Sequence, residues 1–297
     1  METPAPAQAP EVLDAAPEAA LADLVDRALA EDIGSGDLTG VAVVDADARA
    51  RAEVLQKAEG VIAGLDAATA VLARADGAIR VRALVDEGRW RAGGPVLEAE
   101  GPARSLLAAE RVALNLLGHL SGVATLTARF VHAVEGTGAR ILHTRKTTPG
   151  LRDLERRAVL AGGGASHRAG LYDAILVKEN HVAMAGGLTE AARRAVEAGR
   201  APEGGRAVDV VVECEDLVEV EQALAAGVPR VLLDDMPLED VRAAVEMAAG
   251  RAVVEASGGV SLERVREIAE AGVDLISVGA LTHSAPTLDM GMALVRT

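Results

Sequence analysis

The chain has 297 residues, of which 50% are apolar and 25% are charged, as in one large or two medium globular domains. Aromatic residues make up only 1%, so Val, Leu, Ile and Ala must fill the core. The formal net charge of −15 argues against non-specific binding to nucleic acid or anionic membranes, but it leaves room for a small anion in a local basic pocket.

The cysteine count and the N-terminal residues indicate the compartment. A single cysteine, Cys214, leaves no partner for an intrachain disulfide and fits a reducing compartment. The N-terminal stretch lacks the basic and apolar regions of a secretory signal, and no apolar run approaches the ~18 residues that a membrane span needs. We therefore expect a cytoplasmic protein with no membrane partner.

In chain order, the first part of the sequence predicts mixed α/β structure. Residues 1–17 are rich in Pro and Ala and predict a disordered tail. A helix is expected over 18–30, followed by a glycine-punctuated loop. From 48 to about 102 the pattern predicts short strands, with one helix near 64–75.

The next segment, residues 103–135, is strongly helical in pattern. Gly118 and Gly122 interrupt it, and glycine pairs are a common cause of helix kinks. We therefore expect two helices that meet at a bend.

The second half contains a repeat of short apolar segments, each followed by an amphipathic pattern. The ends of the last four segments recur every 21 or 22 residues. Apolar strands that alternate with helices are typical of a parallel sheet, and this regular period predicts an incomplete βα barrel of six or seven strands. The expected strands are 139–143, 173–177, 209–213, 230–234, 252–256 and 274–278.

Polar and small residues follow these strands, where the loops of a βα barrel form the active-site mouth. They are Thr144, Arg145, Lys146, Lys178, Glu213, Asp234, Ser257, Gly258, Gly259, Val278, Gly279 and Ala280. The glycine-rich turns after the last two strands favour a phosphate site, because backbone N–H groups can approach a phosphate where no Cβ intervenes. The alternative is that these are ordinary tight turns.

Residues 141–181 form a basic region in an acidic chain, with seven Lys or Arg residues against four acids. Such a balance favours a polyanionic ligand. Arg152, Arg156 and Arg157 fit the simpler alternative of a solvated helix face. The four cations expected at the mouth are Arg145, Lys146, Arg168 and Lys178.

Two carboxylates close consecutive predicted strands, Glu213 and Asp234. A carboxylate at a strand end often caps the following helix. Opposite a basic pocket, however, these two favour a Mg²⁺ or ribose-diol site, because magnesium prefers hard oxygen ligands and often bridges to substrate phosphates.

Taken together, these residues resemble the quinolinate phosphoribosyltransferase family, the carboxylating nicotinate-nucleotide pyrophosphorylases. The resemblance runs in order over nearly the whole chain beyond the tail. Its motifs are residues 31–39, 110–115, 118–122, 143–152, 162–171, 178–181, 212–214, 233–235, 255–259 and 278–284. The chain departs from the family pattern at His143, Ser166 and Glu179, where an acid, Asn and Asp are usual.

The resemblance implies a pentosyltransferase that transfers phosphoribosyl from phosphoribosyl pyrophosphate to quinolinate and decarboxylates it. The products would be nicotinate mononucleotide, pyrophosphate and CO₂, in de novo NAD biosynthesis. It implies an open α/β sandwich from residues 18–114 with 284–297, and a barrel domain over 115–283. It also implies a homodimer in which the sandwich of one subunit covers the barrel mouth of the other.

The resemblance also assigns site residues. Arg111 would reach the neighbouring subunit's quinolinate, and Lys146, Lys178, Glu213 and Asp234 would be catalytic, the last two with Mg²⁺. Substrate would be bound by Arg111, Thr144, Arg145, Lys146, His167, Arg168, Lys178, Glu213, Asp234, Ser257, Gly258, Gly259, Val278, Gly279, Ala280 and His283. The alternatives are a paralogue of the kind found with molybdate transporters and a non-catalytic nucleotide-binding module.

The roles of three histidines, His119, His143 and His181, remain open at this stage. For His119 and His181 the simpler interpretation is a buried, hydrogen-bonded side chain.

Overall fold

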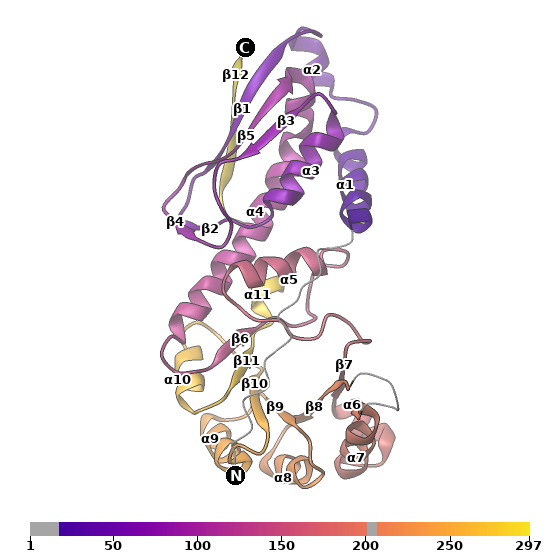
Figure 1. Ribbon diagram of the computed structural model, residues 1–297, viewed down its shortest axis with the longest axis vertical. Helices are drawn as coiled ribbons and strands as arrows, with labels where there is room; N and C mark the ends of the chain where they lie inside the picture. Colours follow the sequence, from indigo (N-terminus) through magenta and orange to yellow (C-terminus); the bar gives the residue numbers. More distant parts are fainter. Residues whose placement is uncertain (1–17, 201–206) are drawn as a thin grey trace. The chain divides into compact units, whose positions relative to one another are not determined.

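The computed structural model describes residues 18–200 and 207–297 (Figure 1). The predicted tail, 1–17, lies outside the described residues. The described chain forms two compact units. One unit, called here the barrel unit, comprises residues 129–146, 164–200 and 207–280, and the other, the sandwich unit, comprises residues 18–128, 147–163 and 281–297.

The barrel unit contains a six-stranded parallel sheet, as the apolar repeat predicts. Its strands are β6 (Arg140–Leu142), β7 (Ala174–Val177), β8 (Asp209–Cys214), β9 (Arg230–Asp234), β10 (Val253–Ser257) and β11 (Leu275–Ser277). The strand order is β6-β11-β10-β9-β8-β7, so β6 and β7 are the two edges. Within the described residues the sheet does not close between these edges, which confirms an incomplete barrel.

Helices connect the strands of the barrel unit and lie outside the sheet (Figure 1). Helix ends follow the local signals: Asp216 caps the N-terminus of the helix after β8 by accepting the Glu219 amide at 2.8 Å. The helices are α6 (Glu179–Ala185), α7 (Leu188–Gly199), α8 (Leu217–Ala225), α9 (Leu238–Ala248), α10 (Val265–Glu270) and α11 (Ala280–His283), which continues into the sandwich unit. Because the connected strands are parallel, their carboxyl ends all lie along the same edge of the sheet.

The sandwich unit is built on an antiparallel sheet of order β12-β1-β5-β3. The C-terminal strand pairs along β1, from Gln56↔Met290 to Ala50↔Arg296, so the chain's end completes this sheet. Its strands are β1 (Arg49–Gln56), β2 (Gly60–Val61), β3 (Arg80–Ala83), β4 (Trp90–Arg91), β5 (Gly94–Pro102) and β12 (Met290–Arg296). Its helices are α1 (Glu18–Ile33), α2 (Leu38–Val43), α3 (Leu65–Ala75) and α5 (Arg152–Ala161), together with most of α4 (Ala103–Ala133).

The expected division into two helices near residue 120 is wrong, because α4 is one continuous helix of 31 residues. A Cβ on Gly118 would lie 3.0 Å from the Leu288 carbonyl oxygen, and one on Gly122 would clash with the Pro286 carbonyl oxygen. Both glycines therefore let the C-terminal segment approach the helix closely. None of the helices in the described residues is long and apolar enough to span a membrane.

Candidate active site

The register of the parallel sheet gathers the predicted strand-end residues at one edge of the barrel unit. Ser257 lies opposite Asp234 on the neighbouring strand, and Glu213 lies opposite Leu232, two residues before Asp234. On the other side Val278 follows β11, where its amide donates to the Leu142 carbonyl of β6 at 3.0 Å. The carboxyl ends of these strands therefore share one polar edge.

A cleft of about 500 Å³ lies along the edge strand β7. Three of the predicted cations line it, namely Arg145, Arg168 and Lys178. Apolar side chains such as Ile175 and Leu171 form the rest of its wall. A ligand with several anionic groups on an apolar body would match this lining.

Two of the cations in this cleft, Arg145 and Arg168, lie close enough to repel each other. Burial, followed by the like charge of Arg145, lowers the pKa of the Arg168 guanidinium, while Asp173 and Glu213 oppose the shift. The Arg168 Nη1 lies 3.4 Å from the Ala174 carbonyl oxygen, so the guanidinium is directed along β7. An anion between the two guanidinium groups would relieve their repulsion, and each planar fork suits a carboxylate.

Lys178 and Glu213 form an ion pair next to this cleft. Burial is the largest influence on Glu213 and raises the pKa of its carboxyl, the Lys178 ammonium opposes that shift, and the charge of Asp234 adds to it. The two predicted metal-site carboxylates therefore lie close enough to repel one another electrostatically.

Glu213 and Asp234 suit a Mg²⁺ ion held jointly by protein and substrate better than one held by protein ligands alone. Within residues 18–200 and 207–297, no group of three or more His, Cys, Asp or Glu side chains is arranged to hold a metal ion. Magnesium is commonly bound by one or two carboxylates, with substrate phosphates and water completing its octahedral shell. Glu213 and Asp234 supply that number of ligands.

The glycine-rich turn after β10 is required by the chain's own packing. Gly258 has a φ of +84°, and a Cβ there would lie 2.7 Å from the Asp235 amide nitrogen. Asp235 itself has a φ of +53° and donates its amide to the Ser257 carbonyl at 2.8 Å. The tight-turn interpretation thus explains Gly258, and phosphate binding by this turn stays a prediction.

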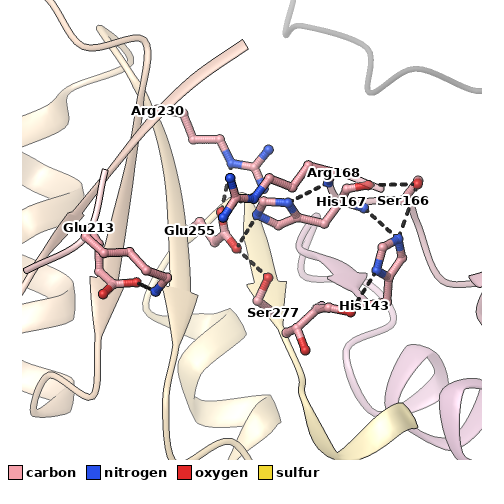
Figure 2. A network of polar contacts seen from close by, with 10 residues as sticks. His143, Ser166, His167, Arg168, Glu213, Arg230, Glu255 and Ser277 are labelled. Atoms are coloured by element: carbon pink, nitrogen blue, oxygen red, sulfur yellow. Dashed lines mark hydrogen bonds and ion pairs between the residues drawn. The ribbon is translucent and has the colours of Figure 1, made fainter. Parts of the chain in front are cut away.

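Glu255, a buried acid on β10 to which sequence reasoning assigned no role, anchors a polar network (Figure 2). Glu255 is 0% exposed. The Arg230 Nε donates to its Oε2 at 2.8 Å, and Nη2 lies 2.7 Å from the same oxygen outside hydrogen-bond geometry. Ser277 Oγ donates to Oε1, and His167 Nε2 lies 3.5 Å from Oε1. The sequence signal that could have indicated this network is an acidic residue, Glu255, inside the apolar segment that forms β10.

The electrostatics of Glu255 follow from these partners. Burial acts to raise the pKa of its carboxyl, but the contacts with His167, Arg230 and Ser277 together outweigh burial and lower it to about 2. Glu255 is therefore a buried carboxylate at neutral pH.

His143 and Ser166, at which the sequence was expected to depart from the family pattern, contact each other. The buried His143 places Nε2 3.3 Å from Ser166 Oγ and accepts the His167 amide at 3.1 Å (Figure 2). Ala165, just before them, donates its amide to the Ile141 carbonyl at 2.7 Å and bridges to β6. The segment that carries Arg168 is therefore fixed against the sheet edge.

The remaining predicted residues fall in other places. Arg111 and His283 belong to the sandwich unit, where Arg111 is exposed on α4 and His283 places Nδ1 2.6 Å from Ser284 Oγ. The interpretation of His181 as buried is wrong, because it is exposed and accepts the Lys178 amide at 3.0 Å at the start of α6. His119 is half-buried and bonds the buried Glu155 at 2.7 Å.

The incomplete βα barrel, with cations and carboxylates gathered at one strand edge, defines a class, that of α/β enzymes with an active site at the carboxyl ends of the strands. Residues 37–121 match the N-terminal domain of quinolinate phosphoribosyl transferase, and residues 123–293 match its C-terminal domain. The chain belongs to the quinolinate phosphoribosyltransferase family.

Relatives of known identity cover nearly the whole chain. The carboxylating nicotinate-nucleotide pyrophosphorylase of Mycobacterium leprae is 44% identical over 92% of this chain and 96% of its own. The probable enzyme of that name from Bacillus subtilis is 39% identical over 92% of each chain. Among solved structures, NadC from Streptococcus pyogenes is 37% identical over 96% of this chain and 100% of its own, with a TM-score of 0.88.

Proposed function

We propose that this protein carries out the reaction of its family, the transfer of phosphoribosyl from phosphoribosyl pyrophosphate to quinolinate with loss of CO₂, a step of de novo NAD biosynthesis. The observation that carries the proposal is the cleft in which Arg145, Arg168 and Lys178 converge beside Glu213. Quinolinate is a flat ring with two adjacent carboxylates, and this lining of cations on an apolar wall suits it.

Arg145 and Arg168 would each bind a quinolinate carboxylate through the guanidinium fork, and Lys146 and Thr144 would extend the anion site toward the donor. Each charge-assisted hydrogen bond contributes about 1.5–3 kcal/mol. Ser257, Gly258, Gly259, Val278, Gly279 and Ala280 are the proposed contacts of the donor's 5′-phosphate, and His283 stays a predicted substrate-binding residue. Glu213 and Asp234 would bind the ribose hydroxyls.

The chemistry would proceed by positioning and electrostatic stabilisation. The C1′–oxygen bond of the donor breaks, pyrophosphate leaves with the electron pair, and Lys146 and Lys178 stabilise its charge. The quinolinate nitrogen forms the new bond to C1′, and the ring becomes a cationic pyridinium. The bond to the 2-carboxylate then breaks, CO₂ leaves, and the electron pair remaining on the ring carbon takes up a proton from solvent.

Magnesium is proposed as the cofactor, held by Glu213 and Asp234 together with oxygens of the donor. When bound, it would neutralise charge on the pyrophosphate leaving group. The carboxylates' part is to present hard oxygen ligands at the strand ends next to Lys178.

The test of this function is release of CO₂ from quinolinate labelled at the 2-carboxylate. Release is expected only with phosphoribosyl pyrophosphate and Mg²⁺ both present, in equal amounts with pyrophosphate and nicotinate mononucleotide. Turnover of nicotinate in its place, or no turnover of quinolinate, would contradict the proposal. The second outcome would favour a paralogue with a changed ligand or a non-catalytic module.

We further propose a cytoplasmic homodimer in which Arg111 acts in the partner subunit's site. The support is that Arg111 is exposed on α4, in the sandwich unit, and therefore accessible to another chain. Arg111→Ala and Lys178→Ala are each expected to be inactive alone. When the two are mixed and exchange subunits, up to about a quarter of wild-type activity is expected to return, because one site in half the dimers is intact. Complete lack of rescue after proven exchange would contradict a shared site.

A further inference from the structure

Glu255 carries a buried charge in β10, where the residues on either side of it are apolar. Glu255 is completely buried between Val254 and Ala256, and burying a carboxylate costs several kcal/mol unless good partners compensate. Arg230 neutralises its charge, and Ser277 and His167 contact its other oxygen. The carboxylate therefore has fixed partners on both oxygens.

The hydrogen bonds of His167 determine which ring nitrogen carries the proton. Nδ1 accepts the Arg168 amide at 2.6 Å, so Nδ1 carries no hydrogen. The ring proton is then on Nε2, which faces Glu255 Oε1 at 3.5 Å. The side chain is only 8% exposed, so both nitrogens are directed to groups of the chain. This geometry differs from the direct substrate contact that the resemblance implies for His167.

The contact through Nδ1 reaches the backbone of a proposed substrate-binding residue. The Arg168 amide is fixed by the ring, and the His167 amide is fixed by His143. Arg168 then extends into the cleft, where its Nη1 contacts the Ala174 carbonyl. The direction in which its guanidinium leaves the chain therefore depends on the orientation of the His167 ring.

We propose that Glu255 is a positioning residue that orients His167, and through it Arg168, toward the carboxylates of the substrate. This inference rests on the proposed function for the identity of that substrate. Glu255 itself contacts no substrate. Its effect is to hold one ring orientation and one tautomer, a role that carboxylates play for functional imidazoles.

The first experiment compares Glu255→Gln with a matched control, Glu155→Gln. Both replace a fully buried glutamate next to a histidine with its neutral isostere, and Glu155 belongs to the sandwich unit. For E255Q we expect the KM for quinolinate to rise about tenfold while the KM for the donor changes less than about twofold. For E155Q both KM values are expected to stay within about twofold. An unchanged quinolinate KM in E255Q, or equal rises for both substrates, would overturn the proposal.

A second pair of variants tests the link through the ring without changing Glu255. In His167→Asn the side-chain oxygen lies near the place of Nδ1 and can accept the Arg168 amide. In His167→Gln the amide reaches toward the place of Nε2 instead. We expect H167Q to raise the quinolinate KM about tenfold and H167N about threefold. Equal rises in the quinolinate KM of H167Q and H167N would show that the ring contacts substrate itself and would overturn the positioning role.

Coupling to Arg168 is tested in the Arg168→Lys background, where the guanidinium fork is absent. E255Q should then raise the quinolinate KM by less than about twofold further, because the group it orients is gone. A full additional tenfold rise would mean that Glu255 acts by another route.

A measurement without substrate separates this inference from the proposed function. Hydrogen exchange of the Arg168 amide is expected to be about tenfold faster in E255Q and unchanged in E155Q. If wild-type protein fails to release CO₂ from quinolinate, the proposed function fails, while this exchange result still decides the positioning role. Unchanged exchange in E255Q would overturn it.

Discussion

The molecule contains two buried glutamate–histidine pairs that differ in their surroundings. In the sandwich unit, Glu155 on α5 accepts from His119 and from the Thr148 amide at 3.1 Å, which fastens the loop before its own helix. In the barrel unit, Glu255 is paired with Arg230 as well as with His167. The first pair joins two helices, α4 and α5, whereas the second joins separate strands and a loop. The comparison shows that the buried acid with a full cationic partner is the one whose histidine contacts the backbone of Arg168, a residue that lines the cleft.

The largest expected effect comes from removing the cation of the barrel-unit pair. Arg230→Ala leaves the Glu255 charge buried without its cation, and breaking a buried pair in this way costs about 3–5 kcal/mol of unfolding free energy. His119→Ala at the other pair removes one hydrogen bond to Glu155 and should cost about 1–3 kcal/mol. Chemical denaturation of both variants measures their unfolding free energies. Equal losses of unfolding free energy would mean that the two pairs do not differ in their contribution to stability.

A double replacement serves as the control for that result. Arg230→Met combined with Glu255→Leu removes both charges and fills their place with apolar atoms, which is often neutral for stability. We expect this variant to recover most of the lost stability but not the affinity for quinolinate. Recovery of both properties would mean that the buried pair has no positioning role.

The acid dependence of stability gives a smaller effect. Glu255 has an ordinary pKa of 4.5 when unfolded and a pKa of about 2 when folded. The folded state therefore favours the ionised carboxylate, and this contribution to stability is fully present above pH 4.5 and is lost as pH falls toward about 2. Wild-type unfolding free energy should fall more steeply than that of E255Q between about pH 4.5 and about pH 3. Parallel curves would show that Glu255 is not ionised in the native protein.

The smallest effect is expected on catalysis at the sandwich-unit pair. His119→Asn should change the KM values for quinolinate and donor by less than about twofold, because His119 contacts Glu155 and no proposed substrate-binding residue. Steady-state kinetics of His119→Asn and His167→Gln, measured side by side, compare the KM values of the two variants directly. A tenfold rise in the quinolinate KM of the His119 variant would show that the two pairs act alike.

Much of the barrel could be predicted because its signals are local. Each of the six expected strands overlaps an observed one, since a short apolar run bounded by turn and helix signals specifies a buried parallel strand. The strand-end residues followed from the same register, because the carboxyl ends of parallel strands share one edge. Four cations were expected at the mouth because they flank strand ends or a glycine-rich loop. Three of them, Arg145, Arg168 and Lys178, line one cleft, and Lys146 is not among the residues that line it.

Other features depended on what packs against a residue. Gly118 and Gly122 suggested two separate helices, yet α4 continues through both glycines, and the segment near Leu288 occupies the space that their side chains would take. His181 is exposed at the start of α6, and the identity of a residue as histidine does not by itself specify whether its side chain is buried or exposed.

By itself, the sequence determined the parallel strands, the polar strand ends and the family, because these are encoded in neighbouring residues and in motifs along the chain. Only the tertiary structure decided that Glu255 meets Arg230, Ser277 and His167. These residues come from three strands and a loop, and their contacts exist only after the sheet has formed. A buried carboxylate is stable only where such partners converge, and no local pattern specifies that convergence.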